Sequence, residues 1–125
     1  MRKITFLAGV LMAPGLVVAG PPHFDSDFMQ AVEDNHKSLT SNLAIQNTES
    51  ALTDAKLLEA SFAEIEAQFV QAGDVPEGVA LAGQARQLIA EVLKALAAND
   101  FQTAANASSA LGRNCKECHQ RYRQD

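Results

Sequence analysis

Positive charge is scarce in this chain. Its 125 residues include ten Lys and Arg against fifteen Asp and Glu, which gives a formal net charge of −5. A protein this acidic lacks the basic surface with which proteins bind phosphate backbones, so we expect no nucleic-acid binding. The chain also shows no nucleophile or acid–base constellation, no low-complexity tract and no clear repeat. We therefore do not expect an enzyme.

Cysteine is equally scarce, since Cys115 and Cys118 are the only two. They cannot complete a structural zinc site, because the chain has no second pair of soft ligands. A thioredoxin-like dithiol needs a βαβ frame, and the sequence has no convincing strand. The residue after the second cysteine points to a different chemistry. His119 completes the run Cys115-Lys116-Glu117-Cys118-His119, whose spacing is that of a c-type haem attachment site.

Helical spacing explains why this motif suits a haem. On a helix, positions i, i+3 and i+4 share one face, so two sulfurs and one imidazole can meet a single flat macrocycle. Cys115 and Cys118 would form thioethers with the two vinyl groups, and His119 would be the proximal iron ligand. The sequence therefore predicts one covalently attached haem c with its iron.

The first 19 residues predict a signal peptide. Arg2 and Lys3 precede an apolar stretch, and residues 17–19 (Val-Val-Ala) fit a small-residue cleavage site. The apolar stretch is broken by Pro14-Gly15 and is too short to span a membrane comfortably. Cleavage after Gly20 and an uncleaved membrane anchor are the less favoured alternatives.

Cleavage after Ala19 would leave residues 20–125 as one domain. Loss of two of the ten positive charges would change the formal net charge from −5 to −7. Export also fits the cysteine motif, because c-type haem is attached outside the bacterial cytoplasm. We therefore expect a periplasmic protein with no membrane span after cleavage.

Apolar residues recur at spacings of three and four in four stretches, which is typical of amphipathic helices. These stretches cover residues 26–45, 49–71, 76–98 and 101–122. Asp25 or Ser26 can cap the first helix, and Pro76 suits the first turn of the third. Four helices of similar length joined by very short breaks pack as antiparallel neighbours. The predicted fold is all-α, an up-down-up-down four-helix bundle with the haem near the C-terminal helix.

The first and last helices carry the predicted haem residues on their apolar faces. The face of the first helix consists of Met29, Val32, His36, Leu39 and Leu43. That of the last consists of Phe101, Ala104, Ala107, Leu111, Cys115, Cys118 and Tyr122. The small residues of the last helix, with Ser108 beside Ala107, would let a neighbouring helix or a haem come close.

The segment Cys115–Arg123 resembles the C-x-x-C-H-x-x-[YF]-[RK] ending of the class II c-type cytochromes, which comprise cytochrome c′ and its low-spin relatives. Members of this family carry the haem motif on the last helix. The resemblance implies the same four-helix bundle and the same functions for the two cysteines and His119. Arg123 stands where the family often has a basic residue near the propionates. Tyr122 either belongs to the core or reaches a propionate with its hydroxyl.

The sixth iron ligand divides this family by function. A thioether from the first helix gives a six-coordinate, low-spin electron carrier, whereas an apolar residue leaves a five-coordinate haem that binds small gases. Met29 is the only methionine left after signal cleavage and lies where the low-spin relatives carry their ligand. We expect it to ligate the iron, although as an apolar residue it would also suit the core.

His36 is the rival ligand on the same helix face. It follows Met29 by seven residues, or about 10 Å along the axis, so the two cannot both suit one iron. A helix-face histidine with a polar partner is the favoured interpretation of His36. If neither residue were a ligand, Val32 or Phe28 would line an open distal pocket.

The predicted function is single-electron transfer between redox partners, with binding of nitric oxide or carbon monoxide as the alternative. Arg113, Lys116, Arg121 and Arg123 place four of the eight mature positive charges in the last thirteen residues. These charges would match the helix dipole and the propionates, or dock an acidic redox partner. A homodimer stays open as the oligomeric state.

Overall fold

The computed structural model describes Gly9 and residues 20–123. Within this part of the chain the structure has four helices and no strand, which confirms the predicted fold class. They are α1 (Ser26–Ala44), α2 (Thr48–Ala72), α3 (Pro76–Ala97) and α4 (Phe101–Tyr122). Their bounds differ from the predicted ones by at most one residue. Except for Gly9, the predicted signal peptide lies outside the described residues.

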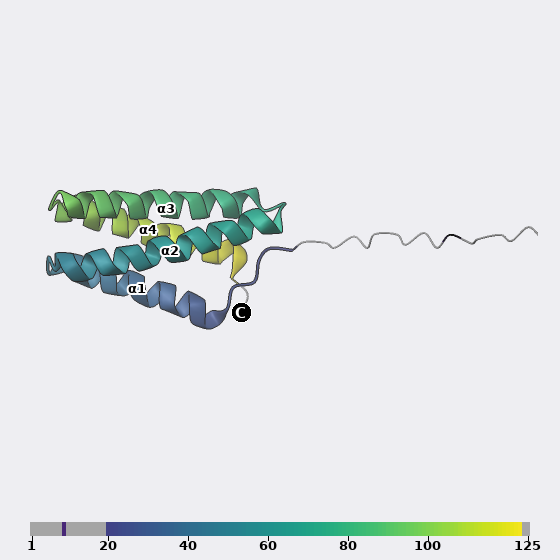
Figure 1. Ribbon diagram of the computed structural model, residues 1–125, viewed down its shortest axis with the longest axis horizontal. Helices are drawn as coiled ribbons and strands as arrows, with labels where there is room; N and C mark the ends of the chain where they lie inside the picture. Colours follow the sequence, from purple (N-terminus) through teal and green to yellow (C-terminus); the bar gives the residue numbers. More distant parts are fainter. Residues whose placement is uncertain (1–8, 10–19, 124–125) are drawn as a thin grey trace, which may run out of the picture.

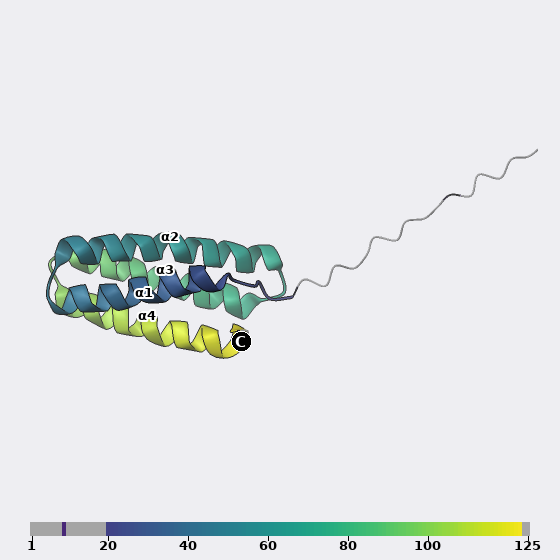
Figure 2. The ribbon, with the colours of Figure 1, turned by 90° about the horizontal axis from the view of Figure 1, so that it is seen from below.

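The helices form an antiparallel bundle in which each packs on two others. α1 and α3 each pack on α2 and α4, and Figures 1 and 2 show the four helices side by side along one axis. The packing of α1 on α4 is the least extensive of the four contacts. None of the described helices is long and apolar enough to cross a membrane.

One end of the bundle contains both ends of the folded chain. The beginning of α1, the connection between α2 and α3, and the end of α4 all lie there (Figure 1). We call this the terminal end. The other end contains the two remaining connections, so a residue late in α4 is level with a residue early in α1.

The helices begin at residues whose side chains satisfy free main-chain N–H groups. Asp25 Oδ1, rather than Ser26, caps α1 by accepting from the N–H groups of Asp27 and Phe28 at 2.8 and 3.3 Å. Asp100 accepts from the Thr103 N–H at 3.0 Å at the beginning of α4. Hydrogen bonds from Thr103 lower the pKa of this carboxyl.

The buried core follows the apolar faces that the sequence predicts. Val32, Leu39 and Leu43 of α1 are buried, whereas Met29 and His36 are half-buried. The largest fully buried side chains are Phe69, Leu39, Leu58, Ile89, Leu111 and Val92. Two buried polar residues, Asp54 and Asn114, were not predicted.

An aromatic cluster of Phe24, Phe28, Phe69 and Tyr122 occupies the terminal end. The Phe69 ring is its centre, with ring centroids 5.6 Å from Phe24 and 5.1 Å from Tyr122. Phe69 lies against Gly78 of α3, where a Cβ would stand 2.3 Å from the ring atoms Cδ1 and Cε1. Because Phe69 is only 1% exposed, its ring has little room to move away.

We therefore expect Gly78→Ala to destabilise the protein by about 1–3 kcal/mol, because overpacking outweighs the gain in helix propensity. The matched control is Gly83→Ala in the same helix, where the Cβ would lie 3.4 Å from Glu66 Oε2, an ordinary van der Waals contact. This control should be neutral or stabilising by up to about 1 kcal/mol. Urea denaturation of both variants measures the difference. Equal stability of the two variants would show that the Phe69 ring adapts freely.

Candidate functional site

The Cys-x-x-Cys-His run forms the last two turns of α4. The helix includes all three residues and ends at Tyr122. The N–H of the next residue, Arg123, donates to the His119 carbonyl at 3.0 Å. Cys115, Cys118 and His119 are all half-buried. The predicted helical spacing of the motif is therefore present at the terminal end of the bundle.

The two thiols form no disulfide, and the pKa of each is raised. Burial raises the pKa of Cys115 to about 11, with smaller contributions from the charges of Cys118 and Glu33. Burial also raises the pKa of Cys118, as does the Glu117 carboxylate. Both thiols are therefore protonated at neutral pH, whereas cysteines that exchange disulfides rapidly have a lowered pKa. This disfavours a redox-active dithiol.

His36 fixes the position of α1 against α4. Its Nε2 lies 2.9 Å from the main-chain oxygen of Ser108, and because a carbonyl only accepts, the imidazole donates this hydrogen bond. A Cβ on Gly112 would lie 3.1 Å from His36 Cε1, so the ring sits directly on α4. The predicted polar partner of His36 is thus confirmed, and His36 is level with Ser108 and Gly112.

The same register brings Met29 to the level of the haem motif. On α1, Glu33 precedes His36 by three residues, and on α4, Cys115 follows Gly112 by three, so each lies about one turn nearer the terminal end than the His36 contact. One further turn along each helix leads to Met29 on α1 and to Cys118 and His119 on α4. Met29 precedes His36 by seven residues, so it points in the same direction to within about 20°. It is half-buried and packs against the core.

His36 itself is not level with His119. Gly112, on which the imidazole rests, lies seven residues before His119, or about 10 Å along α4. The imidazole Nε2 is also engaged by Ser108. Counted from this contact, Met29 is level with His119, whereas His36 lies deeper in the bundle.

The other predicted site residues have different surroundings. Tyr122 is half-buried with its ring against Phe69. Arg123 is exposed just beyond the end of α4. Phe28 is half-buried and stacks on Phe24 with centroids 6.4 Å apart, and Val32 is 4% exposed in the core. Neither Phe28 nor Val32 lines a described pocket.

The predicted group of basic residues is smaller than the sequence indicates. Arg121 pairs with Glu77 of α3 and lies 3.8 Å from Glu117, so neighbouring carboxylates compensate its charge. Arg113 and Lys116 are exposed, and neither forms an ion pair within the described part of the chain. The pairing of Arg121 depends on the α3–α4 contact, which the sequence does not reveal.

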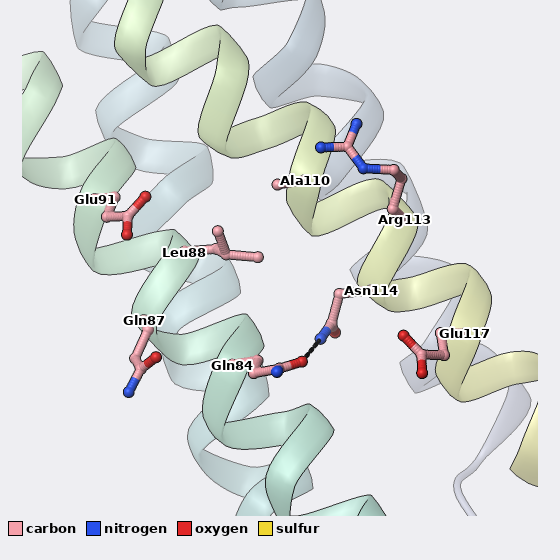
Figure 3. A pocket seen from close by; sticks show the side chains of 8 residues that line it. All are labelled: Gln84, Gln87, Leu88, Glu91, Ala110, Arg113, Asn114 and Glu117. Atoms are coloured by element: carbon pink, nitrogen blue, oxygen red, sulfur yellow. Dashed lines mark hydrogen bonds between the residues drawn. The ribbon is translucent and has the colours of Figure 1, made fainter.

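A groove of about 320 Å³ lies on the other side of α4, between α3 and α4 (Figure 3). Its deepest polar side chain is Asn114, which is 6% exposed. The Asn114 amide donates to the Leu81 carbonyl at 3.0 Å and to Gln84 Oε1 at 3.4 Å. Asn114 lies three residues after Leu111, on the apolar face of α4, so the helical periodicity of the sequence could have indicated that it is buried. This groove faces α3 and is separate from the α1–α4 interface.

The side chains at the terminal end of the α1–α4 interface are of the types that hold a c-type haem. The donor set is an imidazole, a thioether and two protonated thiols, on half-buried side chains between the two least extensively packed helices. The described residues contain no group of three or more His, Cys, Asp or Glu that could hold a metal ion alone.

Comparison of the chain with protein-family models, with curated proteins and with solved structures found no match.

The raised thiol pKa predicts slow alkylation of the haem-free protein. At pH 7, Cys115 should react about a hundredfold more slowly than a thiol with the ordinary pKa of 9.0, and its rate should rise with pH up to about 11. Iodoacetamide labelling followed by mass spectrometry measures this, with Cys118→Ser used to isolate Cys115. The same chain in urea is the control. A rate at pH 7 equal to that of the unfolded chain would contradict the burial of the thiol.

Proposed function

We propose that this protein is a periplasmic monohaem c-type cytochrome that carries single electrons between redox partners. The observation that carries the proposal is the His36–Ser108 hydrogen bond between α1 and α4. Counting residues along both helices from this contact, we infer that Met29 lies at the level of His119, beside the two cysteines. Cys115 and Cys118 would hold the haem by thioether bonds. His119 and Met29 would supply the proximal and distal ligands.

When bound, haem c supplies a one-electron couple between ferric and ferrous iron. The protein would hold the two proposed iron ligands in fixed positions. His119 is carried by a helix that is continuous past it, and Met29 packs against the core. A soft thioether favours ferrous iron and raises the reduction potential. Two ligands held by rigid helices also keep the geometry similar in both oxidation states, which suits rapid electron transfer.

The aromatic cluster supports this function by limiting the access of water to the terminal end. Phe69 is buried, and Phe24, Phe28 and Tyr122 are half-buried around it. An apolar environment around the ligands disfavours the oxidation state with the greater charge and thereby tunes the potential. Arg113, which lines the α3–α4 groove, and Lys116 are exposed on α4 and suit contact with an acidic redox partner.

The sulfur of Met29 distinguishes electron transfer from gas binding. We expect the haem-loaded protein to be low-spin, to show a thioether–ferric charge-transfer band and to be indifferent to carbon monoxide. Met29→Leu keeps most of the side-chain volume but removes the ligand, so this variant should become high-spin and bind carbon monoxide. Optical spectra of both oxidation states, with and without carbon monoxide, test this.

The other outcomes of this experiment are equally informative. A Met29→Leu variant with an unchanged low-spin spectrum would show that Met29 only fills the core. A wild-type protein that is high-spin and binds carbon monoxide would favour the alternative function, a five-coordinate haem protein for nitric oxide or carbon monoxide. Absence of covalent haem by mass spectrometry, after expression with a haem-attachment system, would overturn the proposal.

A further inference from the structure

Polar contacts link three of the four packed helix pairs in ways that do not involve the proposed site. Asp54 of α2, 8% exposed, accepts hydrogen bonds from Ser38 and Asn42 of α1 at 2.8 Å each. Arg86 of α3 pairs with Glu66 of α2 at 3.0 Å. The α3–α4 pair is linked by Asn114 and by Arg121.

The hydrogen bonds described between α1 and α4 all involve one residue, Ser108, which is 2% exposed. His36 Nε2 donates to its carbonyl at 2.9 Å and lies 3.3 Å from its Oγ. The Ser108 Oγ also lies 3.3 Å from Thr40 Oγ1, which donates to the His36 carbonyl at 3.0 Å. His36, Thr40 and Ser108 thus form one hydrogen-bond network about halfway along the α1–α4 interface.

Gly112 lets the imidazole lie between the two helices. A Cβ at this position would stand 3.1 Å from His36 Cε1, so any larger residue would push the ring away from α4. The imidazole ring therefore sets the distance between α1 and α4 at this level. Its hydrogen bond to Ser108 favours one alignment of the two helices along their axes. Apolar side chains alone would specify the register less strictly, because they pack without directional contacts.

We propose that His36 is a positioning residue, which sets the register and separation of α1 against α4 and so holds Met29 level with His119. The inference that this serves iron ligation rests on the proposed function. Met29 lies on the same face about two turns away, and a slip of one residue would rotate it by about 100°. Loss of the His36 contact would therefore release Met29 although neither ligand had been changed.

Two substitutions separate the hydrogen bond from the volume of the ring. His36→Phe fills the space but cannot donate, whereas the side-chain amide of His36→Gln can still donate to the Ser108 carbonyl. The control Ser38→Ala removes the half-buried hydrogen bond from α1 to Asp54 of α2, together with a longer one that Ser38 accepts from Asn42 within α1. Its effect on stability should be similar, while its effect on the position of Met29 should be absent.

The first readout uses the haem-loaded full chain. We expect His36→Phe to weaken the thioether–ferric band and to raise the affinity for carbon monoxide about fivefold, which is the size expected from one lost hydrogen bond. His36→Gln should restore most of the band, and Ser38→Ala should match the wild type. Wild-type spectra and affinity in His36→Phe would overturn the positioning role.

The second readout does not depend on haem. In the haem-free chain carrying Met29→Cys and Cys115→Ser, the rate of disulfide formation with Cys118 reports whether position 29 is level with it. The reaction is started with oxidised glutathione, which accepts the two electrons. His36→Phe in this background should slow disulfide formation about fivefold compared with Ser38→Ala in the same background. An unchanged rate would overturn the inference. The two failures can be told apart. If disulfide formation is slowed but the haem-loaded wild type shows no methionine ligation, the positioning of Met29 by His36 stands and only the proposed function is rejected.

Discussion

The arrangement of the candidate site depends on the hydrogen bond from the His36 imidazole to the Ser108 carbonyl. Because the acceptor is a main-chain atom, this bond ties α1 to the backbone of α4 and not to a movable side chain. Both helices continue without interruption toward the terminal end, so the register fixed here is carried rigidly over about two turns. The levels of Met29, Cys118 and His119 follow from it. A contact in the middle of the bundle thereby determines the geometry at its end.

The positions of the helices could be predicted because apolar spacing and chain breaks agree. Gly73, with a φ of 66°, ends α2, and Pro76 begins α3, so the sequence marks this connection twice. The face of each helix followed from the same periodicity, which placed Met29 and His36 together. The motif at Cys115 predicted its own helical presentation. Local sequence thus determined the elements and which side of each is apolar.

The contacts between elements could not be predicted in the same way. The nearest partner of His36 is the main-chain oxygen of Ser108, which any residue type would supply, so the serine does not identify this contact. Asp54 is buried because two α1 side chains donate to it, and an aspartate in a helical sequence ordinarily indicates a solvent-exposed face. Arg121 looked like part of a basic surface until the fold brought Glu77 beside it. Each depends on the distance between residues far apart in sequence.

The α1–α4 interface joins the first and last helices, whereas the other three interfaces join neighbours in the chain. His36 and Ser108 are separated by 72 positions, so their contact closes a longer loop, at a greater entropic cost, than contacts between consecutive helices. Consecutive helix pairs close shorter loops and the α1–α4 packing is the least extensive, so we expect this interface to form after the others. Under the proposed function, haem attachment before the docking of α1 would find Cys115 and Cys118 accessible from the α1 side. The docking of α1 would then bury the thiols and bring Met29 to its level in a single step.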